Sequence, residues 1–344
     1  MGLMSYIHSW VDTLLTWGKI IQNREVGWLT VDRKTGKYMR EQQPIWKKIK
    51  LLFLFNPLLE WIDRTKLLRY WWHEKAERAG KYESSPTSKK QIKAFVDFYG
   101  IDMSQFEPSD INEYPTFQDF FIRKHKPGFR PIASPDDKTI ATCVADSRLV
   151  VYDSLPQARS IWIKGHHFTL ENLVGAEEPL KKWADAAVAS FRLSPQDYHR
   201  YHSPVTGHVK WYKSIHGDYY AVDPLCIRSD IDVLTSNARC VVAIQSEELG
   251  EVLFVAIGAK EVGTVKIHEH FQKPGTQVQK GDEIGMFEFG GSSIIVAFEK
   301  NRIKFDHDLV YHSNRSVEVN VEMGMTLGKA TMPGGKSEPV GHYG

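Results

Sequence analysis

A serine lies inside an apolar, strand-like run near the C-terminal end of the sequence, directly after two glycines. Residues 285–298 read GMFEFGGSSIIVAF, so that Gly290 and Gly291 precede Ser292 and Ser293. Glycine within a strand pattern usually marks a bulge, a tight bend or a close backbone approach, because it has no Cβ. The carbonyl nearest to the Ser292 hydroxyl in covalent terms is that of Gly291, and no side chain shields it. Ser292 could therefore attack its own backbone, although a glycine-containing strand without chemistry is the alternative for this segment alone.

An acid and two histidines elsewhere in the sequence could assist such a serine. Asp146 lies in the run VADSRL at residues 144–149, and His199 and His202 lie in the run FRLSPQDYHRYHSPVTG at residues 191–207. A histidine that takes the serine proton, together with an acid that orients the histidine, is the general arrangement that activates serine hydroxyls. The residue types for nucleophilic chemistry are present, although Asp146 could instead only stabilise a turn.

The histidines also raise the question of a zinc site. His199 and His202 are three residues apart, and residues 268–270 read His-Glu-His. These spacings are shorter than in H-E-x-x-H, and no cysteine partner is close in sequence, so a zinc site is not favoured. Tyr198 and Tyr201, which flank the histidines, are expected to pack rather than to take part in chemistry.

Taken together, these segments resemble the phosphatidylserine decarboxylase family, whose members make a pyruvoyl cofactor from one of their own serines. Residues 289–293 are similar to the family's self-cleavage motif, in which threonine is commoner at the position of Ser293. Residues 194–204 resemble its histidine motif, and residues 145–148 resemble its aspartate motif. Other similar stretches lie at residues 116–123, 126–132, 161–165, 168–170 and 217–224. The resemblance extends over residues 85–330.

The resemblance implies a self-cleavage reaction. His202 would take the proton of Ser292, and Asp146 would orient and stabilise the resulting imidazolium. The serine oxygen would attack the Gly291 carbonyl, and an ester would replace the peptide bond. β-Elimination would then break the ester, and the dehydroalanine at position 292 would hydrolyse to a pyruvoyl group with loss of ammonia. Residues 1–291 and 292–344 would become separate chains.

The implied product of this reaction is the cofactor. The pyruvoyl carbonyl at position 292 is an electron sink for the carbanion that loss of CO₂ leaves, so no external cofactor and no metal is expected. His199 would protonate the carbanion or position the substrate carboxylate, a role that suits a side chain titrating near neutral pH.

The reaction implied by the resemblance is decarboxylation of phosphatidylserine to phosphatidylethanolamine. A relative with the same fold and cofactor that decarboxylates a soluble amino acid such as tryptophan is one alternative. The intact run at residues 193–199 favours the lipid enzyme, whereas Lys260 and Glu261 stand where lipid enzymes more often have apolar or neutral residues. A serine hydrolase that uses the same acid, histidine and serine is a second alternative, although it would lack the G-x-S-x-G elbow. A non-catalytic membrane-binding protein, which would stay uncut, is a third.

Composition limits the domain organisation and the partners. The 344 residues allow one large domain or two modest ones. Lys and Arg number 44 against 42 Asp and Glu, so a nucleic-acid partner is not expected.

The cysteines Cys143, Cys226 and Cys240 form no C-x-x-C pair, which disfavours a disulfide framework and favours a reducing compartment. No secretory leader is predicted at the start of the sequence. The longest apolar run, residues 51–55, is far shorter than the ~20 residues of a membrane-spanning helix.

The predicted fold class is α+β, with an N-terminal amphipathic helical region followed by a β-rich catalytic core. Residues 43–72 mix basic residues with aromatic and aliphatic ones on both sides of Pro57, which predicts two amphipathic helices. Such helices suit an anionic membrane surface, and equally a cap on the protein's own core. We therefore expect a helical region and linker over residues 1–85, a decarboxylase core over 86–331 and a disordered tail over 332–344. The expected location is intracellular and peripheral to a membrane, with a phospholipid substrate, and the resemblance suggests a homodimer.

Local patterns predict the elements of the core. The polar run at residues 81–88 predicts a linker, and Thr87 or Ser88 is expected to cap a helix over residues 89–99. From Thr139 onward, short alternating or apolar runs predict strands. The strands are expected at residues 148–152, 209–212, 240–244, 252–257 and 294–298, and turns at 274–275, 280–282 and 333–335.

Overall fold

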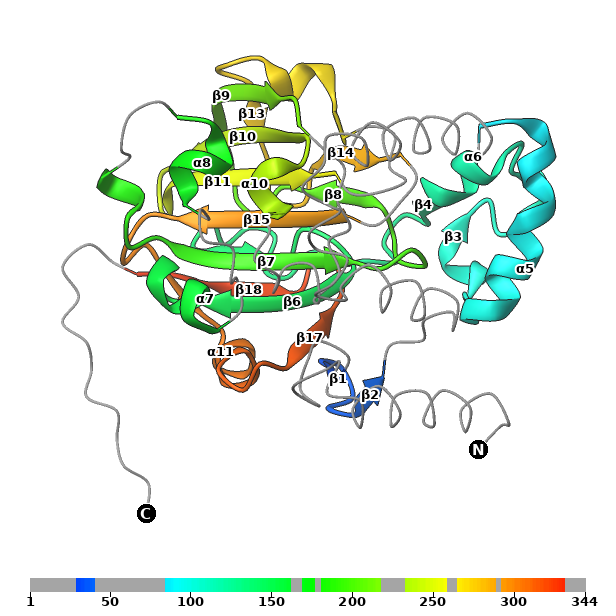
Figure 1. The fold of residues 1–344 in the computed structure, drawn as a ribbon, viewed down its shortest axis with the longest axis horizontal. Coiled ribbons are helices and arrows are strands. Elements are labelled where there is room, and N and C mark those ends of the chain that lie inside the picture. Colours follow the sequence, from blue (N-terminus) through cyan, green and yellow to red (C-terminus); the bar gives the residue numbers. More distant parts are fainter. Residues whose placement is uncertain are drawn as a thin grey trace, which may run out of the picture.

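The computed structural model describes residues 29–40, 84–161, 169–176, 181–217, 233–258, 265–288 and 292–331. Their centre is a ten-stranded sheet in which every neighbouring pair is antiparallel except β1 and β17 (Figure 1). Together with the helices described below, this sheet confirms the expected α+β class. The strand order is β13 (Gln277–Val278), β9 (Gly207–Ile215), β10 (Arg239–Ser246), β11 (Gly250–Ile257), β15 (Ser292–Phe298), β7 (Ala187–Leu193), β6 (Ser147–Tyr152), β17 (Glu318–Val321), β1 (Leu29–Asp32) and β2 (Tyr38–Arg40).

The five strands predicted from apolar patterning are confirmed as β6, β9, β10, β11 and β15. The strand that begins at Ser292 lies in the middle of the sheet, paired with β11 on one side and with β7 on the other. Successive side chains of a strand point to opposite faces of a sheet. In β15, Ile294 and Val296 accordingly belong to the core on one face, and Ile295 and Ala297 to the core on the other. Burial on both faces explains why this strand reads as a continuous apolar run.

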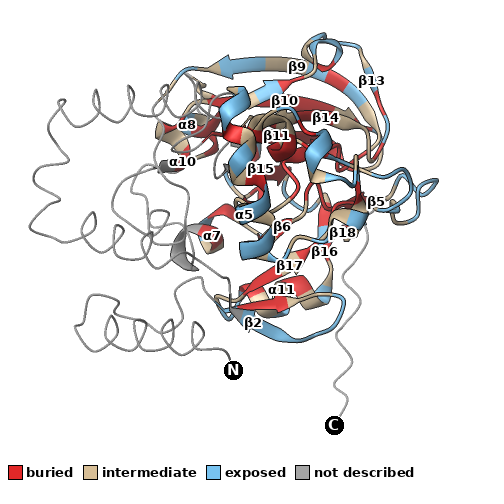
Figure 2. Ribbon diagram, turned by 90° about the vertical axis from the view of Figure 1, so that its right-hand side faces the viewer, coloured by how far each residue is buried: buried red, intermediate tan, exposed pale blue. Residues whose placement is uncertain are grey.

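Each face of the large sheet is covered by a different layer. Helices α7 (Leu155–Ile161), α8 (Leu170–Val174) and α10 (Val233–Ser236) supply apolar side chains to the core on one face. The other core is shared with two three-stranded sheets and α11 (His307–Ser313). These sheets are β12 (Val265–Ile267), β14 (Glu283–Phe287) and β8 (Arg200–His202), and β16 (Ile303–Phe305), β18 (Thr326–Ala330) and β5 (Ile140–Thr142). Figure 2 shows the buried central strands, the exposed edge strand β2 and the partly exposed strand β9.

A small aromatic cluster lies beside this sandwich, at the right of Figure 1. It includes residues of α5 (Lys90–Tyr99) and α6 (Phe117–Phe121), and the strand pair β3 (Phe106–Glu107) and β4 (Lys124–His125) lies next to it in Figure 1. Helix α6 begins with a capping box, in which the side chains of Thr116 and Asp119 each accept a hydrogen bond from the other residue's main-chain N–H. The short 3-10 helices of the described chain are Pro86–Lys89, Met103–Gln105, Ile111–Glu113, Lys181–Trp183 and Glu269–Gln272.

The predicted cap of the helix at residues 89–99 is wrong, although the helix itself is confirmed as α5. A 3-10 turn precedes α5, and the residue at its N-cap position, Lys89, makes no side-chain cap. The Ser88 hydroxyl is buried; it donates to the Ser85 carbonyl and accepts a hydrogen bond of 2.9 Å from the Phe117 N–H. The end of the predicted linker is thus part of the folded cluster, because tertiary contact with α6 replaces local capping.

A β-hairpin at residues 29–40 lies within the region for which helices were expected. Its first strand, β1, pairs in parallel with β17, and its second, β2, forms the edge of the large sheet. The amphipathic segment at residues 43–72, the tail at 332–344 and the turn at 333–335 lie outside the described residues, and the domain boundaries remain a prediction. The turns at 274–275 and 280–282 are confirmed, with Gly275 and Gly281 at φ of 86° and 90°.

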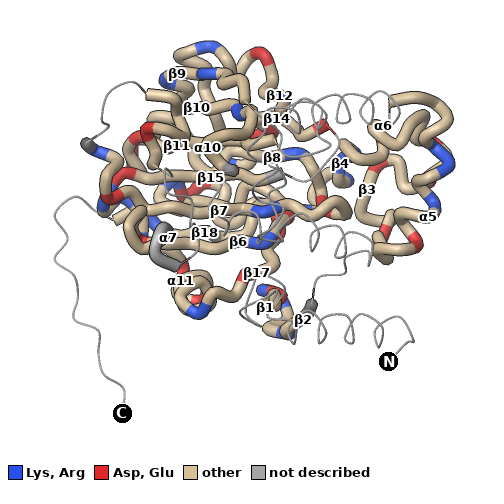
Figure 3. Tube along the Cα trace, in the orientation of Figure 1, with Lys and Arg blue, Asp and Glu red and all other residues tan. Residues whose placement is uncertain are grey.

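Figure 3 shows Lys and Arg interspersed with Asp and Glu over the described part of the chain. Cys143 and Cys240 are buried free thiols, and Cys226 lies outside the described residues. Within the described ranges, no helix combines the length and the apolar character that crossing a bilayer requires.

Candidate active site

The segment that contains Ser292 is held at both ends by the same connection between β7 and β8. At its upstream end, the Phe287 N–H at the end of β14 donates to the His199 carbonyl at 2.9 Å. At its downstream end, Ser292 pairs with Leu193 at the end of β7. Residues 289–291, including Gly291, lie outside the described residues. The chain on either side of the expected cleavage site is therefore fixed to the run that carries the two histidines.

Strand β8 brings both histidines beside the strand that leads to Ser292. In the β14–β8 pair, Glu283 lies opposite His202 and Gly285 lies opposite Tyr201. His199, directly before β8, is fully buried, and its ring stacks on Phe121 with 3.9 Å between ring centroids. Its Nδ1 is 2.9 Å from the carbonyl oxygen of Asp197. This contact with a carbonyl indicates that Nδ1 carries the proton in the neutral ring.

His202 is buried and has a defined partner at each ring nitrogen. Nδ1 lies 2.8 Å from the Gly281 carbonyl oxygen, and Nε2 lies 3.1 Å from the hydroxyl of Tyr198. Burial lowers the pKa of His202 below its ordinary value, although the Gly281 carbonyl and the charges of Glu283 and Asp146 act in the opposite sense. At neutral pH this histidine is therefore uncharged and able to accept a proton.

Tyr198 differs from the sequence expectation that it would only pack. Its ring is buried, but its hydroxyl is a hydrogen-bond partner of His202. Tyr201 does pack in the core, and its hydroxyl donates to the main-chain carbonyls of Lys266 and Met286. The two tyrosines are indistinguishable by sequence, because tertiary packing of β8 and of the turn before it decides which hydroxyl meets an imidazole.

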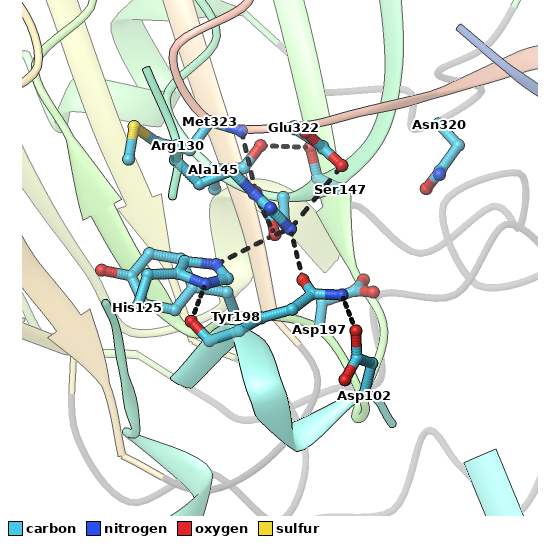
Figure 4. A network of polar contacts seen from close by, with 12 residues as sticks. Asp102, His125, Arg130, Ala145, Ser147, Asp197, Tyr198, Asn320, Glu322 and Met323 are labelled. Carbon is cyan, nitrogen blue, oxygen red and sulfur yellow. Dashed lines mark hydrogen bonds and ion pairs between the residues drawn. The ribbon is translucent and has the colours of Figure 1, made fainter. Parts of the chain in front are cut away.

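Asp146 joins a polar network that the sequence did not predict, and Figure 4 shows its partners His125, Arg130 and Met323. Its carboxylate accepts hydrogen bonds from Arg130, the shortest at 2.7 Å, and from the Met323 N–H at 2.8 Å, and it lies 3.3 Å from His125 Nε2. Burial alone would raise the pKa of Asp146, but the hydrogen bonds and charges of His125 and Arg130 outweigh it and hold the pKa well below its usual range. Asp146 is therefore ionised at neutral pH.

The acid and His202 are neighbours without a direct hydrogen bond among the described residues. The Val144 carbonyl, two residues before Asp146, accepts a hydrogen bond of 2.8 Å from the His202 N–H, which brings the two segments together. The Asp146 charge still raises the pKa of His202 through space. Asp146 also contacts a turn, because its carboxylate joins the Arg130 side chain to the main chain at Met323.

His125 and Arg130 are site residues that sequence reasoning did not single out. Arg130 lies in residues 126–132, a stretch that resembles the family, and His125 lies between this stretch and a similar one at residues 116–123. That similarity was the only signal in the sequence that pointed to either residue. The His125 ring stacks on Phe106 with 4.6 Å between ring centroids and packs against Tyr198 at 4.3 Å. No spacing rule connects residues about twenty positions apart on different elements.

Two arginines, the buried Arg123 and the half-buried Arg148, hold the turn that precedes the histidines. Arg148 pairs with the Asp197 carboxylate, which also accepts a hydrogen bond of 2.6 Å from the Ser194 N–H. Arg123 donates to the carbonyls of Gln196 and Asp197 at 2.6 and 3.2 Å, and burial lowers its pKa to about 10. The Asp197 carbonyl is thus shared between Arg123 and the His199 ring.

The second histidine run has an ordinary structural role. His268 Nε2 lies 2.9 Å from the Glu283 carboxylate, which also pairs with Arg200 at 2.6 Å. Burial would raise the pKa of Glu283, but Arg200 and His268 lower it below its usual value. Within the described ranges, no three His, Cys, Asp or Glu side chains gather in a group that could hold a metal ion.

Comparison with known proteins identifies the family. Residues 117–329 match the family model described as phosphatidylserine decarboxylase. The chain is 39% identical over 303 residues to phosphatidylserine decarboxylase proenzyme 2 of Komagataella phaffii, covering 87% of this chain and 29% of that protein. It is 43% identical over 258 residues to proenzyme 2 of Oryza sativa subsp. japonica, covering 74% of this chain and 41% of that protein. It is 33% identical over 317 residues to the phosphatidylserine decarboxylase proenzyme of Chlamydia trachomatis, covering 88% of this chain and 97% of that protein.

The chain thus spans less than half the length of the fungal and plant relatives and nearly the whole length of the bacterial one. The matched region contains Asp146, both site histidines and Ser292, and it extends over the large sheet from β6 to β17. The chain belongs to the phosphatidylserine decarboxylase family.

Proposed function

We propose that this chain is a proenzyme that cuts itself between Gly291 and Ser292 and then decarboxylates phosphatidylserine to phosphatidylethanolamine. The observation that carries the proposal is the attachment of both ends of the serine segment to the β7–β8 connection. Phe287 is hydrogen-bonded to His199, and Ser292 is paired with Leu193. Both ends of the expected cleavage segment are thus attached to the run that carries two buried histidines.

In the proposed self-cleavage, His202 is the general base. It is buried and uncharged at neutral pH, and it can therefore accept the Ser292 proton. The serine oxygen forms a bond to the Gly291 carbonyl carbon, and the peptide C–N bond breaks to give an ester. The negative charge of Asp146 stabilises the imidazolium through space, because it raises the pKa of His202. Elimination and hydrolysis then release ammonia and leave a pyruvoyl group at position 292.

The residues present fit a cofactor made in this way. The serine stands at the first position of a central strand, and the buried imidazoles of His199 and His202 supply proton-transfer groups on the run that leads into β8, the partner of β14. A pyruvoyl group supplies an electron sink for loss of CO₂. We assign to His199 the transfer of a proton to the substrate carbon, because its ring is held by Phe121 and by the Asp197 carbonyl.

The choice of a phospholipid over a soluble amino acid follows from the relatives. The fungal, plant and bacterial proteins are all named phosphatidylserine decarboxylase proenzymes. Lys260 and Glu261, the two residues whose charge is unusual for a lipid enzyme, lie outside the described residues. We also propose an intracellular, peripheral location on an anionic membrane surface, which the composition of residues 43–72 supports.

Intact mass and a decarboxylation assay test the proposal together. Mass measurement of the freshly purified protein should give two fragments that meet at Gly291 and Ser292, the smaller with a blocked terminus. Release of CO₂ from the serine carboxyl of phosphatidylserine in mixed micelles should follow, and tryptophan should release none. A single full-length mass with no lyase activity would favour the hydrolase or the non-catalytic alternative. Activity on tryptophan alone would move the substrate to the soluble class.

A further inference from the structure

The hydrogen-bond partners of His202 determine where its ring proton lies. A carbonyl oxygen only accepts, so the 2.8 Å contact between Nδ1 and the Gly281 carbonyl requires the proton on Nδ1. In the neutral ring, Nε2 then has the lone pair, and the Tyr198 hydroxyl 3.1 Å away must be the donor. Nε2 is therefore the nitrogen that can act as a base.

Tyr198 is itself held so that its hydroxyl stays beside Nε2. Its ring stacks on the His202 ring at 5.8 Å between centroids and packs against the His125 ring at 4.3 Å. Burial raises the pKa of Tyr198 well above its ordinary value, so that the phenol keeps its proton at neutral pH and can donate it. His125 in turn lies beside the Asp146 carboxylate. The hydroxyl thus has a fixed position between the acid-bearing network and His202.

The charged groups around His202 act on its pKa in both directions. Glu283 on β14 and Asp146 before β6 favour the protonated ring, whereas His125 on β4 disfavours it. A hydrogen bond donated to Nε2 stabilises the neutral ring, and it therefore adds to the effect of burial. The Tyr198 hydroxyl is the contact in this set that acts on Nε2 directly.

We propose that Tyr198 is a positioning residue for self-cleavage, whose hydroxyl holds the His202 ring in the Nδ1–H tautomer and keeps Nε2 unprotonated as the base for Ser292. The role rests on the proposed function of His202. When the Tyr198 O–H bond rotates away, the Nε2 lone pair is free to take the serine proton, and the tyrosine itself gains and loses no proton.

The test compares Tyr198→Phe with Tyr201→Phe. Phenylalanine keeps the ring that packs on His125 and His202 and removes only the hydroxyl. Tyr201→Phe is the matched control, because it removes another buried hydroxyl of the same run, one that bonds main-chain carbonyls rather than an imidazole. Precursor made in a cell-free translation mixture and transferred to buffers from about pH 5.5 to 8.5 gives the rate of cutting, since ordinary histidines titrate in this window.

Tyr198→Phe should cut about five to ten times more slowly than the parent at its plateau, the loss expected for one hydrogen bond. The midpoint of its rate–pH profile should move to higher pH by about half a unit, because the neutral ring loses a donor. Tyr201→Phe should keep the parental midpoint. A folded Tyr198→Phe protein with the parental rate and midpoint would overturn the proposal, because a residue that only fills space would give that result.

A spectroscopic measurement tests the same proposal without any cutting. In uncut Ser292→Ala protein labelled with ¹⁵N-histidine, the His202 signals, assigned by their loss in a further His202→Gln variant, should report a protonated Nδ1 and an unprotonated Nε2. Adding Tyr198→Phe should give a mixture of tautomers. An Nε2–H tautomer in the protein with Tyr198 present would overturn the proposal even if Tyr198→Phe did not fold. Failure of the parent to cut at every pH would instead refute the proposed function, and the tautomer would still decide the role of Tyr198.

Discussion

The main-chain carbonyl of His199 accepts a hydrogen bond of 2.9 Å from the N–H of Phe287. This bond ends the pairing of β14 with the histidine run. Because Ser292 is paired with Leu193 on the same connection, the expected cleavage segment leaves and rejoins one stretch of backbone. The positions of Phe287 and Ser292 therefore depend on the pairing of β14 with β8 and of β15 with β7.

Replacing His202 and replacing His199 should block different steps, self-cleavage in the first case and decarboxylation in the second. His202→Ala should leave the chain uncut, as Ser292→Ala should, because the serine loses its base; a general base contributes about 10²–10⁴-fold to rate. His199→Ala should be cut normally yet decarboxylate about 10²–10⁴-fold more slowly. Gel analysis measures cutting, and CO₂ release measures turnover. The two variants are matched, since each truncates a buried histidine of the same run. Normal cutting in His202→Ala would remove it from the role of base.

The stability of the protein should depend on pH through Asp146. Its pKa is lowered by folding, so its contribution is present above the ordinary value of 3.8 and is lost as the pH falls from there towards the lower folded-state pKa. In the uncut Ser292→Ala background, adding Asp146→Asn should lower the free energy of unfolding by about 3 kcal/mol at neutral pH, because Arg130 and His125 lose their carboxylate. Below pH about 4 the difference between the two proteins should shrink.

Urea unfolding at several pH values measures this effect. The matched control is Asp97→Asn, which removes the same charge from an exposed pair with Lys93 on α5 and should change stability by less than about 1 kcal/mol. A difference between Asp146→Asn and its parent that stayed constant down to acid pH would show that the stabilisation does not come from the ionised carboxylate.

Arg33 should help to hold the C-terminal fragment after cutting. It follows β1, and its guanidinium binds Asp306 and Asp308 at 2.7 Å each and the Thr326 carbonyl. All three partners belong to residues 292–344, whereas Arg33 belongs to residues 1–291. Because several charged hydrogen bonds are lost at a mostly buried guanidinium, Arg33→Ala should destabilise the cut protein by about 2 kcal/mol.

Urea unfolding and gel filtration of the cut protein test the role of Arg33. Lys34→Ala is the control on the same hairpin, because its pair with Glu322 is exposed on the lysine side and should contribute no more than about 1 kcal/mol. Equal effects of the two substitutions would contradict a specific role for Arg33. Dissociation of the two fragments at a lower urea concentration in Arg33→Ala, but not in Lys34→Ala, would support a specific role for Arg33.

Membrane binding should depend on residues 43–72. Basic and aromatic residues of amphipathic helices bind anionic surfaces through both charge and apolar contact, so binding should weaken with salt. Flotation with vesicles that contain an anionic phospholipid should recover the full chain, and deletion of residues 43–72 should abolish recovery. Vesicles of neutral lipid are the control. Unchanged flotation of a deleted protein that still cuts itself would assign this segment to another task.

The sequence alone determined the elements whose signal is local. The apolar runs at residues 240–244, 252–257 and 294–298 predicted the central strands, because burial on both faces removes polar residues from a strand. The unshielded Gly291 carbonyl before Ser292 and the histidine run indicated nucleophilic chemistry, and their order along the chain indicated the family. These signals depend on covalent neighbours and on backbone periodicity, which do not change with the packing around them.

Only the tertiary structure decided which side chains meet. The partners of Asp146 are His125, Arg130 and the Met323 N–H, and the partner of His202 Nε2 is Tyr198. Likewise, the parallel pairing of β1 with β17 joins residues nearly 290 positions apart. Such contacts arise from the register between strands and from the packing of separate elements, and a slip of one residue would turn each side chain to the other face. No pattern within a single segment encodes that choice.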